Sequence, residues 1–286
     1  MALSIQPTSA TCGARVTGVN LGEALSEDLV AELRAAWVKH HVLIFPDQHL
    51  NDKDLVRFTE HFGDIGDDPF FEPIAPDNPV FALTRRADEK APVFAETWHS
   101  DWSFKTHPPI GTCLYSLVIP PMGGDTGFAD QQRAVTEMPD ALRRRLEGQR
   151  ALHCAAVAYA PDGFYGDSEA EADRSMKIIT NDSARDVFVH DIITKHPESG
   201  NETIFGTYGY ICGIEGMPDE EALPLIRELH TWQIRDQFQY QHQWQANMLV
   251  MWDNRSVLHR AYGGYDGYDR ELHRTTIAGS AEYSIN

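Results

Sequence analysis

The stretch "TWHSDWSF" (residues 97–104) places a histidine and an aspartate, separated by one residue, within a run of aromatic side chains. In an extended strand, residues i and i+2 point to the same face, so His99 and Asp101 would be directed to the same point. An imidazole and a carboxylate placed in this way supply two ligands of a three-ligand metal site. The same side chains can also form an ordinary hydrogen bond, and the spacing alone favours that simpler interpretation. The remainder of the chain has to distinguish the two.

The composition indicates a globular protein without affinity for polyanions. The chain has 286 residues, of which 42% are hydrophobic, and this is enough for a substantial core. Its formal net charge of −19 argues against binding to nucleic acid or to an anionic membrane, because phosphate contacts require clustered lysine and arginine. The longest apolar runs, such as "TCLYSLVIPPM" (112–122), have the length of strands rather than of membrane-spanning helices, and we expect no secretory signal.

The four cysteines are widely separated, and none of them forms a CxxC pair. This spacing argues against a zinc ribbon, a redox motif or a disulfide scaffold, and it is typical of a protein from a reducing compartment. We therefore expect four thiols without a special role and a cytoplasmic location. The cysteines are Cys12, Cys113, Cys154 and Cys212.

The pattern of apolar residues predicts a mainly β protein with flanking helices. Helical spacing with capping residues predicts helices over 26–39, 51–63, 132–147 and 219–230. Short apolar runs bounded by turn residues predict strands over 41–46, 97–104, 111–119, 127–130, 186–195 and 202–211, followed by a strand-rich C-terminal region. Early helices followed by many short strands favour a double-stranded β-helix, that is, a jelly-roll or cupin-like core. We expect residues 1–286 to form one domain and the polar segment 155–185 to form a long loop or lid over the site.

A third ligand would complete the metal site, and the best-placed candidate is His259. Two histidines and one carboxylate leave three adjacent coordination positions open, as in the facial triad of non-haem Fe(II) oxygenases. The chain has 13 histidines, and His259 follows the strongly apolar stretch 248–252 at the far end of the strand-rich region. Others lie at helix ends or in a turn, where they are less well placed as ligands: His40, His41, His196 and His230.

Four motifs occur in the order and spacing of a known enzyme family: "WHSD" (98–101), "GGDTGFAD" (123–130), "MWDNRSVLHRAY" (251–262) and "RELHRTTIAG" (270–279). From the opening "GARVTGVNL" (13–21) onward, the chain resembles the Fe(II)- and 2-oxoglutarate-dependent dioxygenases of the taurine dioxygenase and aryloxyacetate dioxygenase family over nearly its whole length. Each motif alone is weakly specific, whereas the combination is highly specific. The resemblance implies that His99, Asp101 and His259 bind Fe(II).

The resemblance also implies a site for 2-oxoglutarate, which would chelate the metal through its C1 carboxylate and keto oxygen. Thr126 and Arg270 match the family positions that hold its C5 carboxylate, and Arg270 lies 11 residues after His259 (270 − 259). A planar guanidinium binds a buried carboxylate through two hydrogen bonds, and a hydroxyl adds a third. The stretch 252–254 resembles the residues that precede the distal ligand in the family, and we expect it to support His259.

Arg274 matches a second family arginine, which implies an anionic head group on the substrate: a sulfonate, sulfate ester, carboxylate or phosphonate. Taurine itself is disfavoured, because Asp68 and Ala95 occupy the positions that match the taurine-binding histidine and asparagine of the family. Aromatic residues would form an apolar wall around the body of the substrate. Trp102 and Tyr210 match pocket-wall positions of the family, and the candidates as a whole are Phe70, Phe71, Phe94, Trp102, Tyr159 and Tyr210.

The implied activity is hydroxylation of a substrate C–H bond with O2 and 2-oxoglutarate, with succinate and CO2 as co-products. We expect a small anionic substrate, no nucleic-acid or membrane partner, and a homo-oligomer, either a dimer or a tetramer. Two alternatives remain open. A zinc-dependent hydrolase or isomerase would use the same three ligands without needing Arg270. A non-catalytic jelly-roll binding protein would keep the ligands without turnover.

Overall fold

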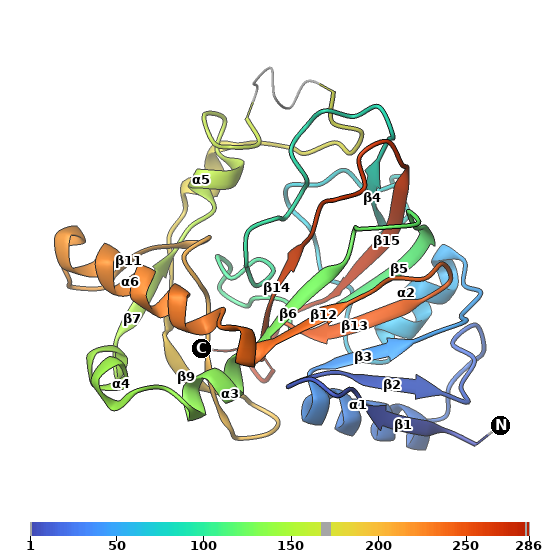
Figure 1. The fold of residues 1–286 in the computed structure, drawn as a ribbon, viewed down its shortest axis with the longest axis horizontal. Helices are drawn as coiled ribbons and strands as arrows, with labels where there is room; N and C mark the ends of the chain where they lie inside the picture. The colour runs from blue at the N-terminus through green and yellow to red at the C-terminus, as the bar shows by residue number, and fades with distance from the viewer. Residues whose placement is uncertain (1, 167–172, 284, 286) are drawn as a thin grey trace.

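The computed structural model describes residues 2–166, 173–283 and 285 of the chain. Within these residues the strands form a seven-stranded sheet, two three-stranded sheets and a two-stranded sheet. Figure 1 shows helices α1 (Glu27–His40) and α2 (Asp52–Glu60) beside the large sheet. None of the helices in the described residues is long and apolar enough to span a membrane.

The large sheet has the strand order β1-β2-β3-β13-β5-β15-β4, and its neighbouring strands are antiparallel except for β2 and β3. Its strands are β1 (Ser4–Pro7), β2 (Ala14–Thr17), β3 (Val42–Phe45), β13 (Leu249–Asp253), β5 (Gly111–Val118), β15 (Arg270–Ile277) and β4 (Phe81–Arg85). A smaller antiparallel sheet has the order β12-β6-β14. Its strands are β12 (Gln239–His242), β6 (Thr126–Asp130) and β14 (Val257–Ala261).

Alternation of side chains across the large sheet separates two hydrophobic cores. On β3, Leu43 and Phe45 pack in a core shared with α1 and α2, whereas Val42 and Ile44 pack on the opposite face. That opposite face also holds Phe128 of β6, so the three-stranded sheet covers it. Because successive strand residues point to opposite faces, the continuous apolar run "VLIF" contributes to both cores. The two sheets therefore lie face to face.

A second group of helices and strands forms the other end of the molecule (Figure 1). Helices α3, α4 and α6 pack with β7 and β11 around a separate apolar cluster that includes Leu146, Leu229 and Trp232. The elements of this end are α3 (Gln131–Thr136), α4 (Asp140–Leu146), α6 (Asp219–Gln233), β7 (Arg150–His153), β8 (Phe188–Asp191), β11 (Ile211–Ile214), β9 (Ile193–Lys195) and β10 (Glu202–Ile204).

The mainly β architecture with flanking helices is confirmed, and three of the four expected helices are present as α1, α2 and α6. The Ser26 hydroxyl caps α1 by accepting a hydrogen bond from Leu29 N, and Asn51 and Asp54 form a reciprocal capping box at the start of α2. These caps explain why both N-termini could be predicted within one residue.

Some of the predicted elements are divided. The expected helix over 132–147 is wrong, because Pro139 lies between α3 and α4 and proline supplies no backbone donor. The expected strand over 202–211 is interrupted, and its ends form β10 and the first residue of β11. The expected loop over 155–185 contains the short helix α5 (Ala156–Tyr159) and a 3-10 turn at its end, and residues 167–172 of it lie outside the described residues.

The predicted strand over 97–104 is wrong. Its backbone makes one isolated antiparallel bridge, between His99 and His259, and then turns, with Trp102 in the left-handed conformation at φ 45°. Trp98 packs on the outer face of the three-stranded sheet, whereas Trp102 packs in a separate aromatic cluster. The turn between them allows the two tryptophans to pack in these two different clusters. The two candidate ligands in this stretch therefore converge through a turn and not through strand alternation.

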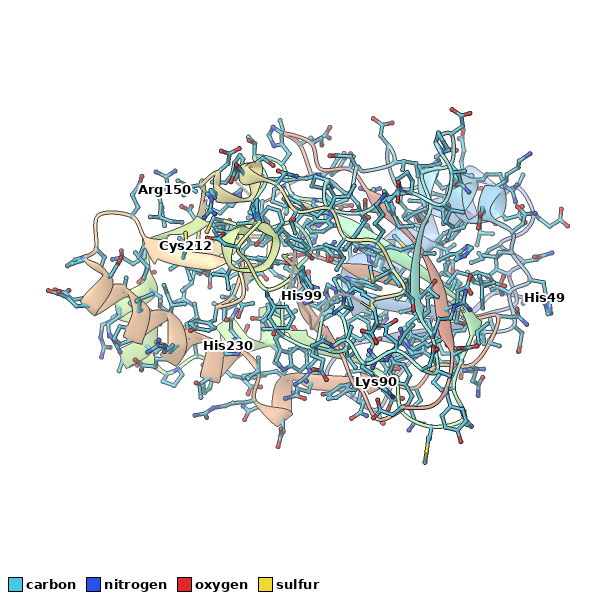
Figure 2. All side chains as sticks on the ribbon, turned by 90° about the horizontal axis from the view of Figure 1, so that it is seen from above. His49, Lys90, His99, Arg150, Cys212 and His230 are labelled. Atoms are coloured by element: carbon cyan, nitrogen blue, oxygen red, sulfur yellow. The ribbon has the colours of Figure 1, made fainter. Side chains whose placement is uncertain are left out.

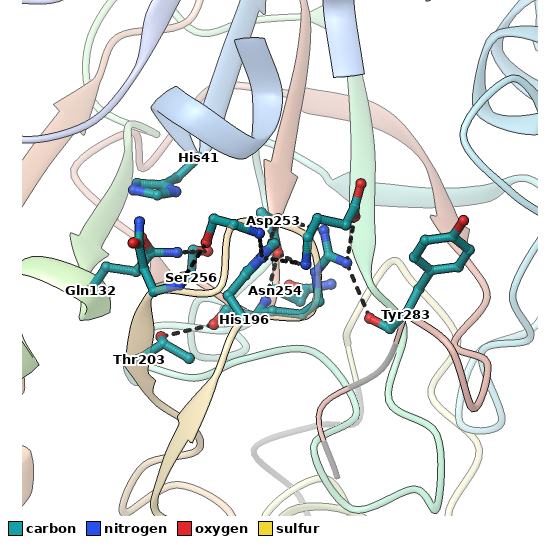
Figure 3. A network of polar contacts seen from close by, with 12 residues as sticks. His41, Gln132, His196, Thr203, Asp253, Asn254, Ser256 and Tyr283 are labelled. Carbon is teal, nitrogen blue, oxygen red and sulfur yellow. Dashed lines mark hydrogen bonds and ion pairs between the residues drawn. The ribbon is translucent and has the colours of Figure 1, made fainter. Parts of the chain in front are cut away.

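A buried network of charged side chains fixes the turn between β13 and β14 (Figure 3). Asp253 accepts hydrogen bonds from Arg255 Nε at 2.8 Å, from Arg255 Nη2 at 2.7 Å and from His196 Nε2 at 2.9 Å. Arg255 Nη1 also donates to Glu198 at 2.8 Å and to the Tyr283 carbonyl at 3.1 Å. Burial alone would raise the pKa of Asp253, but the Arg255 guanidinium holds it far below its usual value. Every buried charge in the network has a partner, which makes its burial tolerable.

The network predicts a large loss of stability for Asp253→Asn. The substitution keeps the shape of the side chain but removes the negative charge that faces His196 and Arg255, and the Arg255 guanidinium then keeps its pairing with Glu198. We expect the free energy of unfolding, measured by urea denaturation, to fall by about 3–5 kcal/mol. The control is Glu215→Gln, which removes an exposed ion pair with Arg150 and should cost about 1 kcal/mol or less. Equal losses in the two variants would contradict this interpretation of the network.

Candidate active site

The side chains of His99, Asp101 and His259 converge at one point in the interior, and Figure 2 labels His99 near the middle of the molecule. Their possible ligand atoms all lie within 4.8 Å of one another. Asp101 Oδ1 is 3.8 Å from His99 Nε2 and 3.6 Å from His259 Nε2, distances too long for hydrogen bonds. No other group of His, Cys, Asp or Glu side chains in the described part of the chain has this arrangement. Three donors that converge without bonding to one another fit a metal ion between them.

Backbone pairing brings the two histidines together from 160 positions apart (259 − 99). His259 N donates to His99 O at 2.8 Å, and His99 N donates to His259 O at 2.9 Å. The centroids of the two imidazole rings lie 4.2 Å apart. On β14, His259 is opposite Phe128 of β6, a residue of the core between the two sheets. The distal histidine therefore points between the sheets.

The surroundings favour the protonation states that metal binding requires. His99 Nδ1 lies 2.8 Å from the Thr97 carbonyl, which only accepts, so Nδ1 carries the proton and Nε2 keeps its lone pair. Burial lowers the pKa of His99 and lowers that of His259 strongly, which keeps both rings neutral. Burial alone would raise the pKa of Asp101, but the Arg274 guanidinium lowers it to about 2.

A chain of hydrogen bonds orients the other oxygen of Asp101. Thr112 Oγ1 donates to Asp101 Oδ2 at 2.6 Å and accepts from Asn254 Nδ2 at 3.1 Å. Asn254 Oδ1 in turn accepts from Trp252 Nε1 at 2.9 Å. The ring of Trp252 packs against His259 as expected, at a centroid distance of 4.7 Å. Asn254, expected to support His259, supports Asp101 instead.

A cavity opens beside the three candidate ligands, and both residues expected to hold 2-oxoglutarate line it. Arg270, on β15, is buried; its Nη2 donates to the Gly124 carbonyl at 3.0 Å, and its Nε has no hydrogen-bond partner among the described residues. Burial lowers the pKa of Arg270. Thr126 Oγ1 accepts from Trp244 Nε1 at 2.9 Å, which leaves the hydroxyl hydrogen able to donate. A buried guanidinium in need of an anion fits a carboxylate ligand at this end of the cavity.

Two consecutive glycines form the turn that precedes Thr126. Gly123 and Gly124 both adopt the left-handed conformation, at φ 68° and 71°, which favours glycine. A Cβ atom on Gly123 would lie 2.5 Å from the Gly264 carbonyl oxygen, and one on Gly124 would lie 3.0 Å from Arg270 Nε. The "GGDT" motif therefore lets the backbone approach the Arg270 side chain closely.

Arg274 lies between two carboxylates. Its Nη2 is 3.2 Å from Asp101 Oδ1 and 3.6 Å from Asp68 Oδ1, and all three side chains are buried. The guanidinium also packs over the rings of Trp102 and Phe71, at centroid distances of 5.3 and 5.7 Å. Asp68 accepts a hydrogen bond from Trp102 Nε1. Of these residues, Arg274 and Asp101 line the cavity, whereas Asp68, Trp102 and Phe71 lie behind the guanidinium.

The remaining expected residues reach the site from different sides. Ala95 lines the cavity, and its carbonyl accepts a hydrogen bond from Ala261 N at 2.8 Å. Tyr210 is not part of the cavity wall; its ring meets His99 edge-on at a centroid distance of 6.2 Å and Phe104 at 4.7 Å. Tyr210 therefore supports a candidate ligand from behind.

Sequence reasoning missed several residues of the cavity wall, among them Arg174 and Met176. Arg174 and Met176 both line the cavity, and the neighbouring Ser175 N donates to Glu89 Oε2 at 2.9 Å. They belong to the irregular segment 155–185, which has no apolar periodicity and no motif that could have marked them. The sequence indicated them only through the general prediction that segment 155–185 forms a long loop or lid over the site.

Two histidines and a carboxylate beside a cavity with a buried arginine are typical of mononuclear non-haem iron oxygenases. The sequence model of the family described as "Taurine catabolism dioxygenase TauD, TfdA family" matches residues 4–276, and the chain belongs to this family.

Relatives agree over nearly the full length. The alpha-ketoglutarate-dependent 2,4-dichlorophenoxyacetate dioxygenase of Cupriavidus pinatubonensis is 30% identical, over 98% of this chain and 99% of that protein. The alpha-ketoglutarate-dependent sulfate ester dioxygenase of Pseudomonas putida is 29% identical, over 99% of this chain and 92% of that protein. The crystal structure of a taurine dioxygenase from Burkholderia xenovorans superposes with a TM-score of 0.79 at 26% identity, over 98% of this chain and 92% of that one.

The chain is accordingly an oxidoreductase, a dioxygenase that uses Fe(II), 2-oxoglutarate and O2. This result favours the dioxygenase prediction over a hydrolase, an isomerase or a non-catalytic binding protein.

The hydrogen bond from Thr112 to Asp101 predicts weaker metal binding in Thr112→Val. The variant has nearly the same shape but no longer orients the carboxylate, and such support around a metal ligand contributes roughly 10–100-fold in affinity. The measurement is a calorimetric titration of the metal-free protein with Mn(II). Thr276→Val is the matched control, because Thr276 is opposite Thr112 on β15 and its buried hydroxyl has no partner among the described residues. Equal Mn(II) affinities for the two variants would contradict a supporting role for Thr112.

Proposed function

We propose that the chain hydroxylates a C–H bond of a small anionic organic substrate, with His99, Asp101 and His259 as the ligands of Fe(II). Arg270 and Thr126 hold the C5 carboxylate of 2-oxoglutarate. The observation that carries the proposal is the buried Arg270 guanidinium, which lines the same cavity as the candidate ligands. A protein that used the three ligands alone would have no need of this costly charge.

Fe(II), 2-oxoglutarate and O2 together supply an oxidant strong enough to attack a C–H bond, with succinate and CO2 as co-products. The side chains of the protein position the reactants. His99, Asp101 and His259 would hold Fe(II) through three ligand atoms and would leave room at the metal for the co-substrate. Arg270 would pair with the far carboxylate, and the Thr126 hydroxyl would donate a further hydrogen bond to it. This contact fixes the orientation of the co-substrate relative to the metal.

Arg274 and Thr112 have a second task in this scheme. They keep Asp101 ionised and oriented, because one places a positive charge beside the carboxylate and the other donates a hydrogen bond to it.

The fold proposal is a double-stranded β-helix within a single domain spanning 1–286. It is supported by the common apolar core of the seven-stranded and three-stranded sheets. The position of His259 on the inner side of β14 agrees with it, because jelly-roll enzymes place their sites between the two sheets.

The proposed substrates are aryloxy carboxylates and sulfate esters, the compounds named for the relatives of Cupriavidus and Pseudomonas. Arg274 is the cation that meets the anionic head group. Its charge is shared with Asp101 and Asp68, so it attracts an anion less strongly than an unpaired arginine would. Apolar contacts with Phe94 and Met176 must then supply more of the binding energy. This balance favours substrates with an apolar body over a compact zwitterion such as taurine.

Substitution of Arg270 tests the 2-oxoglutarate site. Arg270→Ala leaves the C5 carboxylate without its cation, which costs about 3–5 kcal/mol, or a loss of about 100-fold or more in affinity. Calorimetric titration of the Mn(II)-loaded protein with 2-oxoglutarate measures it. Arg85→Ala is the control, because Arg85 lines the same cavity but is already paired with Glu89 at 3.4 Å. Unchanged 2-oxoglutarate affinity in Arg270→Ala would overturn the assignment.

Substitution of Asp68 tests how the protein tunes Arg274. Asp68→Asn keeps an acceptor for Trp102 and removes the negative charge beside the guanidinium. We expect phenoxyacetate and hexyl sulfate to bind about tenfold more tightly to the Mn(II)–2-oxoglutarate form, a difference of about 1.4 kcal/mol. Asp67→Asn, at an exposed carboxylate paired with Lys105, should change nothing. If Asp68→Asn binds these anions no better than Asp67→Asn does, Asp68 does not weaken the anion site.

A further inference from the structure

Part of the cavity wall is formed by residues 173–176, a stretch that we call the wall segment. Arg174 and Met176 of this segment line the cavity. The four residues of the wall segment belong to no helix or strand and form no strand pairing. Because no backbone ladder fixes them, contacts from neighbouring parts of the chain have to hold the two cavity-lining side chains in place.

Among the described residues, four hydrogen bonds join the wall segment to the loop 86–92, which directly follows β4. In one of them, Ser175 N donates to Glu89 Oε2 at 2.9 Å. The other three use backbone groups of the loop: Arg86 N donates to Ser175 Oγ at 3.2 Å, Lys90 N to Asp173 Oδ2 at 2.6 Å and Arg174 Nη2 to the Pro92 carbonyl at 2.9 Å. Only the first of the four bonds uses a side chain of the loop, so Glu89 is the loop position at which a substitution can remove a contact.

The Glu89 carboxylate is buried, and an arginine on β4 compensates its charge. Glu89 is 6% exposed, and its Oε1 lies 3.4 Å from Arg85 Nη1. Arg85 is fixed in turn, because its Nη1 donates to the Ala91 carbonyl at 2.7 Å and its Nη2 to the Glu89 carbonyl at 3.3 Å. A carboxylate is stable in the interior only with such partners, and its hydrogen bond to a backbone N–H is stronger than a bond between neutral groups. Glu89 therefore connects the end of β4 to the wall segment.

This connection bears on Met176, the residue after Ser175. Met176 is buried and packs in the aromatic cluster against which Phe94, another cavity-lining residue, also packs. Beyond Met176, Ile179 N donates to the Phe70 carbonyl at 2.8 Å. The backbone is thus held on both sides of Met176. Because a methionine side chain is flexible, the position of its backbone decides which part of the cavity it fills.

We propose that Glu89 is a positioning residue for substrate recognition, which holds Met176 in the cavity wall by accepting the hydrogen bond from Ser175 N. The inference rests on the proposed function, in which Phe94 and Met176 contact the apolar body of the substrate. The side-chain partners of Glu89 are Arg85 and Ser175, and neither is a candidate metal ligand or a residue that holds 2-oxoglutarate. Loss of the carboxylate therefore weakens the binding of substrate and leaves the binding of 2-oxoglutarate unchanged.

The first measurement is hydrogen–deuterium exchange of the full chain without metal, read by mass spectrometry of peptides that cover residues 173–179. In Glu89→Ala these peptides should exchange faster than in the wild-type protein, because Ser175 N has lost its acceptor. Glu89→Gln keeps an acceptor oxygen and should exchange more slowly than Glu89→Ala. The matched control is Glu72→Ala, which removes an exposed ion pair between Glu72 and Lys177 in the same stretch and should leave the exchange unchanged.

The second measurement is calorimetric titration of the Mn(II)–2-oxoglutarate form with hexyl sulfate. Glu89→Ala should bind hexyl sulfate about tenfold more weakly than the wild-type protein, roughly the effect of losing apolar contact with two CH2 groups. Glu89→Gln should recover most of the affinity, and Glu72→Ala should bind as the wild-type protein does. The affinity of the Mn(II)-loaded protein for 2-oxoglutarate should be the same in all of these variants, because a positioning role at the wall segment does not extend to that site.

Three results would count against the inference. If the wall segment exchanges no faster in Glu89→Ala than in Glu72→Ala, or if these two variants bind hexyl sulfate equally well, Glu89 does not position the cavity wall. If Glu89→Ala loses affinity for 2-oxoglutarate to the same extent as for hexyl sulfate, its role is general stability of the fold. A wild-type protein that binds neither hexyl sulfate nor phenoxyacetate would contradict the proposed substrate class itself, and this inference would fail with it.

Discussion

Burial of the Asp101 carboxylate is the constraint on which the rest of the site depends. A carboxylate in the interior is stable only when other groups neutralise and orient it. In this protein Arg274 supplies the charge and Thr112 the hydrogen bond, while two neutral histidines face the same oxygen. The arrangement leaves that oxygen available to a metal, because neither histidine is close enough to form a hydrogen bond with it. The same arrangement of side chains therefore balances the charge of Asp101 and directs one of its oxygens toward the two histidines, where a metal would bind.

Support for this carboxylate extends outward in layers. Thr112 is held by Asn254, which belongs to the turn between β13 and β14, and Asp253 in that turn is fixed by Arg255 and His196. The cavity in which a substrate would bind is not lined by Thr112, Asn254, Asp253, Arg255 or His196. Their role is to hold the turn that joins the large sheet to the strand of the distal histidine. These buried charged side chains are thus explained by their role in holding the turn in place, and not by a direct part in the reaction.

Much of the site could be predicted from the sequence. The candidate metal ligands, the paired glycines and the spacing of the arginines form motifs that can be recognised without knowledge of the fold. The conformation of residues 97–104 could not be predicted. Trp98 and Trp102 pack in two different clusters, and a regular strand, which would point both side chains to one face, cannot place them there. The pairing of Asp68 with Arg274 could not be predicted either, because the two residues come together only in the folded tertiary structure.

The most direct test of the account is an anaerobic visible absorption spectrum of the purified protein with Fe(II) and 2-oxoglutarate. If His99, Asp101 and His259 bind the metal and the neighbouring cavity holds 2-oxoglutarate against it, a metal-to-ligand charge-transfer band should develop as 2-oxoglutarate is added. The band should be absent with Fe(II) alone or with succinate in place of 2-oxoglutarate. Bound iron, shown by metal analysis of the same sample, without any such band would contradict the central claim that metal and co-substrate share one site.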